Sequence, residues 1–239
     1  MGKGRAYGLG LIDRYTGLIF NKQNITLSGT ANKGSSFFMK GEKYMNVPII
    51  ETEGFQGSRE VRLDARFLKK NKVFLLGEIT ADSAVELTQK LIFLENEPSA
   101  ERIKLYINSP GGEITSGLLI YDVLQAMTKE VDLYCLGMAA SMAAVLLASG
   151  KRGHRHILPH SRTMIHEPLI GNSIGGSATS IRHLSESIMD TKRLVNDILA
   201  RHVGKTPEEI DKATAFDNYM NAEESIAFGI CDDITTNIF

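Results

Sequence analysis

Three side chains that lie far apart in the sequence, Ser141, His166 and Asp217, have the types that acyl transfer requires. A serine hydroxyl is a weak nucleophile until a base accepts its proton, and histidine is the base that most often does so. A carboxylate then fixes the tautomer of the imidazole and stabilises the imidazolium. These residue types allow a triad with Ser141 as nucleophile, His166 as general base and Asp217 as the orienting acid.

The local setting of Ser141 suits this role without requiring it. The segment GMAASMAA, which begins at Gly137, should carry an apolar strand through small residues into a helix that starts near Ser141. Unpaired amides at a helix start point toward an anion that forms beside them. The segment is not the G-x-S-x-G elbow of other hydrolases. Taken alone, the segment is better explained by a serine that only caps a helix, among alanines that only pack.

His166 is the histidine best placed to act as a base. An apolar strand, Thr163 to Ile165, leads into it, and Glu167-Pro168 follows, so its side chain should have a fixed position. A purely structural histidine fits the same setting. The others are expected on polar surface or on a long helix: His154, His156, His160, His183 and His202. Asp217, which precedes aromatic residues, would by itself be interpreted as a turn or cap residue.

A glycine pair supplies candidates for binding an oxyanion. Asn108-Ser109-Pro110-Gly111-Gly112 follows an apolar strand at its carboxyl end. Glycines there let a backbone amide point at a developing negative charge. A simple strand-to-helix turn would use the same residues.

The elements that position these residues alternate along the chain. Apolar runs predict strands, helical spacing of apolar residues predicts helices, and strands separated by helices of this length indicate an α/β fold with a mainly parallel sheet. Strands are expected at 73–76, 103–107, 132–136, 156–158 and 163–165. Helices are expected from a cap at Asp82 or Ser83, at 115–127, from about 141 to Gly150, from 178 to Gly204, after Thr206 and from 222.

Composition limits the class of protein. The chain has 239 residues, 43% of them hydrophobic, and a formal net charge of -1. This balance gives no electrostatic reason to expect nucleic acid or an anionic membrane as a partner. Two cysteines indicate a reducing compartment, and the sequence contains neither a long apolar run nor a signal-peptide pattern, so we expect a cytoplasmic protein. Short charged stretches such as 151–156 are expected to be solvated surface.

Glycine distribution divides the chain in two. Eight of the 22 glycines fall within the first 41 residues. Because glycine loses most backbone entropy on ordering, residues 1–45 are interpreted as an arm, flexible or processed, and 46–239 as the domain that carries the candidate triad. Gly171 to Gly176 is expected to form a loop or edge segment.

Four motifs, INSPGG, GMAASMAA, MIHEP and FDNYMNAEE, occur in this order. From about residue 47 to 234 the chain resembles the Clp peptidase family, the proteolytic subunit of the ATP-dependent Clp protease. The resemblance implies a serine endopeptidase with the triad Ser141, His166 and Asp217 and an oxyanion hole formed by the amides of Gly112 and Met142. It also implies the spiral α/β fold shared with crotonases, with the helix from Ala178 as a handle.

The same resemblance implies an assembly and a partner. Two stacked seven-membered rings would enclose the active sites, and a separate AAA+ ATPase would feed in unfolded protein substrates. The sequence lacks the phosphate-binding loop G-x-x-x-x-G-K-[ST] and the zinc motif H-E-x-x-H, so no cofactor or metal is expected on this chain.

Departures from the family pattern indicate a divergent paralogue. Ala215 and Phe216 replace the acidic residue and arginine that help to join the rings. Some positions of the ATPase-docking pocket are less apolar than usual, which predicts a weakened contact. The positions that match the pocket include Tyr106, Tyr134, Leu136 and Leu158. The less apolar ones are Ala126, His156 and Thr235.

Other functions compete with the peptidase. One is a weakly active structural or regulatory ring subunit that assembles with an active paralogue. Another is a prophage-type protease that matures capsids. A crotonase-like coenzyme A enzyme is disfavoured, because it would not need this serine and histidine. Cleavage specificity is not predictable from the sequence.

Overall fold

The computed structural model describes residues 49–54, 57–169 and 176–239. The arm predicted for residues 1–45 lies outside these ranges, and so does most of the predicted loop from Gly171 to Gly176. Within the described residues the central element is a seven-stranded sheet.

The sheet is mainly parallel, as the alternation of strands and helices predicts. Its main path runs in the order β3 (Lys72–Leu76), β4 (Arg102–Ser109), β5 (Glu130–Ala140), β6 (Arg155–Ile157) and β9 (Asp233–Ile234), all paired in parallel. The second half of β5 pairs instead with β7 (Arg162–Ile165), and β8 (Asn218–Met220) pairs antiparallel with β7. The expected α/β fold is confirmed.

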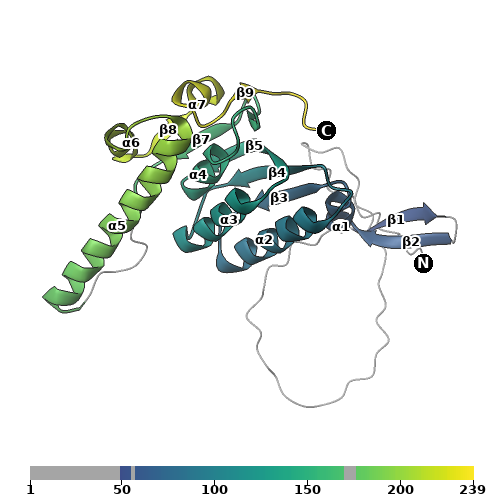
Figure 1. The fold of residues 1–239 in the computed structure, drawn as a ribbon, viewed down its shortest axis with the longest axis horizontal. Helices are drawn as coiled ribbons and strands as arrows, with labels where there is room; N and C mark the ends of the chain where they lie inside the picture. Colours follow the sequence, from purple (N-terminus) through teal and green to yellow (C-terminus); the bar gives the residue numbers. More distant parts are fainter. Residues whose placement is uncertain (1–48, 55–56, 170–175) are drawn as a thin grey trace, which may run out of the picture. The chain divides into compact units, whose positions relative to one another are not determined.

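Helices supply the rest of the core. Helices α2 (Ala81–Asn96) and α3 (Ile114–Ala126) lie over one face of the sheet (Figure 1). Every residue of the short helix α4 (Met142–Ala148) is buried, since it packs against α3, α5 and β5. The remaining elements are α1 (Leu63–Leu68), α6 (Pro207–Thr214), α7 (Ala222–Phe228) and a hairpin of β1 (Ile49–Gly54) and β2 (Gly57–Arg62).

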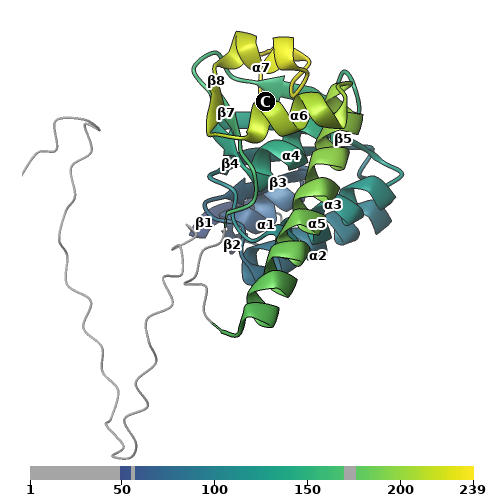
Figure 2. The ribbon, with the colours of Figure 1, turned by 90° about the vertical axis from the view of Figure 1, so that its left-hand side faces the viewer.

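The long helix α5 (Ala178–Val203) extends beyond the sheet in both ribbon views (Figures 1 and 2). Its C-terminal half holds its buried residues, whereas its N-terminal half is exposed. Gly204, with φ of 75°, ends the helix in a left-handed conformation, as expected. The helix therefore joins the core at one end only.

The start of α2 differs from the prediction. Thr80, rather than Asp82 or Ser83, is the N-cap: its side chain accepts from the Ser83 amide, and the Ser83 side chain accepts from the Thr80 amide. This reciprocal pair satisfies two amides at once, which a cap placed two residues later would not do.

The stretch 151–156 was expected to be solvated surface, and this is wrong for three of its residues. Arg155 is only 2% exposed. It donates to the Asp232 carboxylate and to the carbonyls of Ala148, His202 and Gly229.

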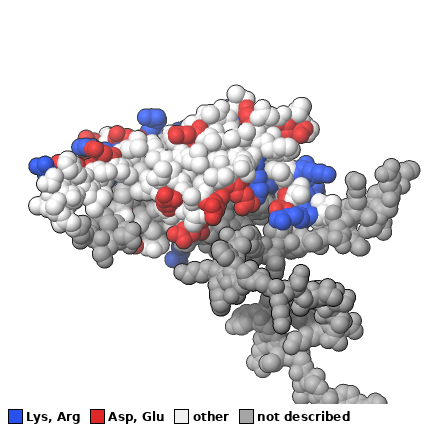
Figure 3. Space-filling view, turned by 90° about the horizontal axis from the view of Figure 1, so that it is seen from below, with Lys and Arg blue, Asp and Glu red and all other residues white. Residues whose placement is uncertain are grey.

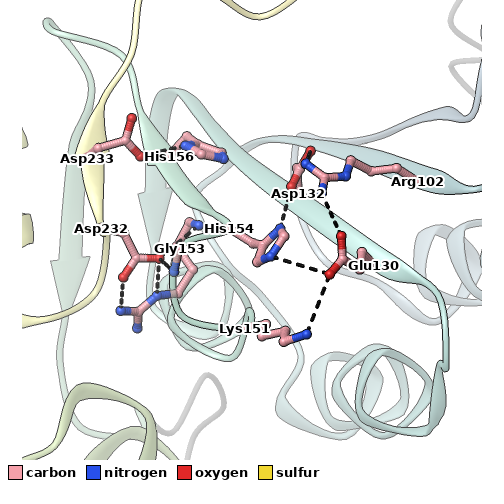
Figure 4. Close-up of polar contacts among 10 residues, drawn as sticks. Arg102, Glu130, Asp132, Lys151, Gly153, His154, His156, Asp232 and Asp233 are labelled. Carbon is pink, nitrogen blue, oxygen red and sulfur yellow. Dashed lines mark hydrogen bonds and ion pairs between the residues drawn. The ribbon is translucent and has the colours of Figure 1, made fainter.

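The neighbouring histidines are partly buried (Figure 4). His154 Nδ1 lies 2.6 Å from Asp132 Oδ1, and His156 Nδ1 lies 2.6 Å from Asp233 Oδ1. The acids come from other strands, so the sequence around residue 154 does not reveal them. Pairing with these acids offsets the cost of partly burying the two histidines.

Charges are mixed on the surface. On the face in Figure 3, Lys and Arg side chains form separate groups beside Asp and Glu, and no continuous basic surface is visible among the described residues there. In the part of the chain that the structure describes, no helix is both long and apolar enough to cross a membrane.

Candidate active site

Ser141 lies where the central strand β5 meets α4. Its φ of 55° is rare for a residue other than glycine, and its side chain makes no capping hydrogen bond although it occupies the N-cap position. The Ser141 amide donates to Met164 O of β7 at 2.8 Å. The backbone is thus held in a strained turn whose hydroxyl is not used to cap the helix. Such strain is typical of functional positions.

The sequence prediction for the residues before Ser141 needs a correction. Met138, Ala139 and Ala140 pair in parallel with β7, so they belong to β5 and do not form a turn. The predicted strand ended at residue 136, because small residues give a weak strand signal and the pairing with β7 is a long-range contact.

His166 follows β7 directly, and its Nε2 lies 2.9 Å from Ser141 Oγ. The imidazole is 15% exposed. With Nε2 unprotonated, the serine hydroxyl donates to it, which is the arrangement that a general base needs. The sequence-predicted pair of residues, 25 positions apart, is brought together.

Asp217 lies beside the other ring nitrogen. Its Oδ1 is 3.3 Å from His166 Nδ1, and its side chain is 57% exposed. The two atoms are at ion-pair distance but lack hydrogen-bond geometry, since Nδ1 is buried without a hydrogen-bond partner among the described residues. Catalytic hydrogen bonds are often loose in the absence of substrate. All three predicted side chains therefore converge, and the contact to Asp217 is the loosest.

A glycine turn lies directly against the serine. A Cβ added at Gly111 would lie 2.6 Å from Ser141 Cβ and 3.1 Å from the Met142 nitrogen. Ile79 holds this turn on the other side, since its amide donates to Gly111 O and its carbonyl accepts from the Glu113 amide.

The amide of Gly112 in this turn and that of Met142 at the start of α4 remain available to donate a hydrogen bond. Within the described residues, neither donates to another protein group. Gly112 has a φ of 150°, and its position leaves no room for a side chain beside the Ile79 carbonyl. These two amides, together with the serine, are the groups that an oxyanion site requires.

A largely apolar pocket opens beside the Ser141–His166 pair. Its polar members other than this pair are Asn196 and Thr214. The rest of its lining is aliphatic or Met and Pro, drawn from α3, α4, α5 and the end of β7: Ile114, Met142, Val145, Ile165, Pro168, Val195 and Leu199. Its free volume is only about 20 Å³, so it would have to widen before an apolar side chain of a bound peptide could enter.

Other predicted features lie elsewhere. In the described ranges no three His, Cys, Asp or Glu side chains gather in a way that could hold a metal ion. Tyr106, Tyr134 and His156, which the resemblance assigns to a docking pocket, stack side by side across β4, β5 and β6, with ring centroids 5.2 and 4.7 Å apart. Phe74 of β3 extends the stack, at 5.1 Å from Tyr106.

One contact near the site was missed in the sequence analysis. Lys192 on α5 pairs with Glu167, next to His166, and with Asp211 on α6. A signal was present: Lys192 precedes Val195 and Leu199 at helical spacing, so it lies on the buried face of α5. A lysine on an apolar face needs a partner.

Together these observations define an α/β protein with a mainly parallel sheet and a serine–histidine pair at the end of its central strand. The family model of the Clp protease matches residues 55–238. The chain belongs to the Clp protease family.

Proposed function

We propose that the chain is a serine endopeptidase subunit that cleaves unfolded polypeptides through an acyl-enzyme. The observation that carries the proposal is the 2.9 Å approach of His166 Nε2 to Ser141 Oγ, in a serine whose hydroxyl caps nothing. His166 accepts the serine proton as the hydroxyl attacks the peptide carbonyl, then returns it to the leaving amine. Water hydrolyses the acyl-enzyme by the reverse roles. Asp217 orients the imidazole.

The remaining site residues have matching roles in this proposal. The amides of Gly112 and Met142 receive the oxyanion of the tetrahedral intermediate. In this proposal the apolar pocket widens to receive the side chain before the cleaved bond, which favours peptides with an apolar residue there. No cofactor on this chain takes part; ATP would be used by a partner ATPase.

The proposed assembly is a double ring of seven-membered rings, made of this chain or of this chain with a paralogue. Exposed apolar side chains support association through α5, which projects from the core (Figure 2). Between 41% and 49% of each of these side chains is exposed: Ile181, Leu184, Met189 and Leu194. Exposed apolar side chains on a projecting helix suit a protein–protein contact.

A fluorophosphonate probe tests the nucleophile in the full-length protein. We expect labelling of the wild type and none of Ser141→Ala. Ser177→Ala is the matched control, since Ser177 is also an N-cap but accepts a capping hydrogen bond from the Ser180 amide. The control should lose helix stability and keep its labelling. Labelling that survives Ser141→Ala would refute the assignment.

A second candidate function, a weakly active ring subunit that assembles with an active paralogue, is favoured by one observation. Asp217 is 57% exposed and makes no hydrogen bond to His166, and the preceding Phe216 is 86% exposed where the family has arginine. Peptidase assays on the pure chain and on a mixture with a paralogue separate the two functions. Robust cleavage by the pure chain excludes the second.

A further inference from the structure

Lys192 differs from the other charged residues of α5. Its side chain is 16% exposed, and its Nζ lies 2.9 Å from Glu167 Oε2 and 2.7 Å from Asp211 Oδ1. By contrast, Arg193 pairs with Asp190 on the same helix with both side chains about two-thirds exposed or more, at 71% and 68%. Hydrogen bonds from Lys192 to Asp211 and Glu167 raise the pKa of its ammonium. The lysine is covered although its partners are partly exposed, Glu167 at 43% and Asp211 at 57%, and it differs from an ordinary surface pair in being shared by two acids from two other segments.

The two acids stand on the two segments that carry the rest of the triad. Glu167 is the residue after His166, and Asp211 lies on α6, which leads into Asp217. Two backbone contacts join these segments: the Glu167 amide donates to Thr214 O at 2.8 Å, and Asn218, the residue after Asp217, pairs with Ile165 where β8 meets β7. The Lys192 ammonium adds a side-chain link between the segments, from a third element.

Alignment of the triad depends on how these two segments lie relative to each other. His166 is held on the sheet by β7, whereas the Asp217 carboxylate is exposed and sits 3.3 Å from Nδ1 without hydrogen-bond geometry. Pairing of Asn218 with Ile165 anchors the backbone on one side of Asp217, so a shift of α6 would act on the carboxylate from the other side. Without Lys192, two carboxylates would face each other with no cation between them, and their repulsion would favour such movement.

We propose that Lys192 is a positioning residue for the triad: it ties Glu167 to Asp211 and thereby fixes Asp217 against His166. It contacts none of the reacting atoms. This inference rests on the proposed function, because the effect on chemistry passes through the Ser141–His166 pair.

The test compares fluorophosphonate labelling rates of full-length variants. Lys192→Met should label about 10- to 100-fold more slowly than wild type, since misplacement by about 1 Å has effects of this size. Lys192→Arg should restore most of the rate, because a guanidinium can reach both carboxylates. Arg193→Met, the exposed neighbour, should label at the wild-type rate. With a peptide substrate, kcat should fall and KM should stay unchanged.

A double-mutant cycle distinguishes positioning from general damage. If Lys192 acts through Asp217, Lys192→Met should have little further effect in an Asp217→Asn background. An equal slowing in both backgrounds overturns the proposal, and so does Lys192→Met labelling as fast as wild type. If Lys192→Met fails to fold, Glu167→Gln carries the same test, since it removes one link and keeps the ammonium paired with Asp211.

A readout that needs no activity separates this proposal from the proposed function. If the wild type is not labelled, the proposed function fails, yet hydrogen exchange of the Glu167 amide still reports the link between the segments. Exchange should be faster in Lys192→Met and unchanged in Arg193→Met. An unchanged rate in Lys192→Met overturns the role of Lys192.

Discussion

Replacing Gly111 with alanine should displace the nucleophile without touching it chemically. Gly111 has a φ of 90°, and a Cβ built there would lie 2.6 Å from both Ser141 Cβ and Ala140 O. Gly153 offers a matched control, since its φ is 87° and a Cβ built there meets nothing within 4 Å. The two substitutions share the backbone penalty and differ in the clash.

The magnitudes follow from this comparison. Alanine in a left-handed conformation costs roughly 1–2 kcal/mol at either position, so Gly153→Ala should lose about that much free energy of unfolding and Gly111→Ala more, because its Cβ also clashes with Ala140 O. At Gly111 the new methyl and Ser141 must also move apart by roughly 1 Å to reach ordinary contact distance. A nucleophile misplaced by about 1 Å can lose about 100-fold in rate. Gly111→Ala should therefore react about 100-fold more slowly, and Gly153→Ala at the wild-type rate.

Two measurements check the prediction in the full-length protein: urea unfolding for stability, and the second-order rate constant of fluorophosphonate labelling for the site. The reasoning is refuted if Gly111→Ala is folded and labels as fast as Gly153→Ala. It is also refuted if both variants lose labelling equally, because the shared backbone strain would then explain the loss.

Three further predictions concern buried ionisable groups. Arg155→Met should lower the free energy of unfolding by about 3–5 kcal/mol in urea titrations, because it leaves Asp232 without its buried partner. Arg152→Met, at an exposed neighbouring position, should change it by less than about 0.5 kcal/mol. Burial alone would raise the pKa of Asp232, but hydrogen bonds from Arg155 and from backbone amides lower it below 3.8 overall. The stability that the Asp232–Arg155 pair contributes is therefore complete above pH 3.8 and is lost as pH falls through the pKa of folded Asp232. Wild type and Arg155→Met should converge in free energy of unfolding at strongly acidic pH, and a difference that stays constant with pH contradicts this. Burial raises the pKa of the Cys135 thiol to about 12 and also raises the pKa of the Cys231 thiol. Neither thiol should react with a disulfide reagent at pH 8 until the protein unfolds. Rapid reaction of either thiol in the native protein would show that it is accessible.

Much of the fold could be predicted because its signals are local. The strands β3, β4 and β7 and the helices α3 and α5 start and stop within one or two residues of the predicted limits, and α6 starts where predicted. Buried apolar runs, helical spacing and caps such as Thr206 are local signals in the sequence. The extension of β5 to Ala140 was missed because its pairing with β7 is a long-range contact. The buried state of Arg155 was missed for the same reason, as its carboxylate partner lies 77 residues away.

The site was only partly accessible in this way. A structural explanation was as good for His166 and better for Ser141 and Asp217 when each was considered alone, and only the motifs taken together singled them out. The strained backbone of Ser141 and the link through Lys192 depend on contacts between elements, which residue types do not specify. The lack of a hydrogen bond between Asp217 and His166 likewise depends on how the two segments are placed in the fold.

The four-way contact of Arg155 imposes an order on the maturation of the chain during synthesis. A guanidinium does not lose its proton at physiological pH, so water must stay around it until Gly229 and Asp232 have left the ribosome and closed over it. The strands that carry Ser141 and His166 emerge earlier, beside an interior that is still wet. A nascent chain therefore completes its core only after Ser141, His166 and Asp217 have all been translated. A truncation before residue 229 should yield a hydrated, protease-sensitive intermediate.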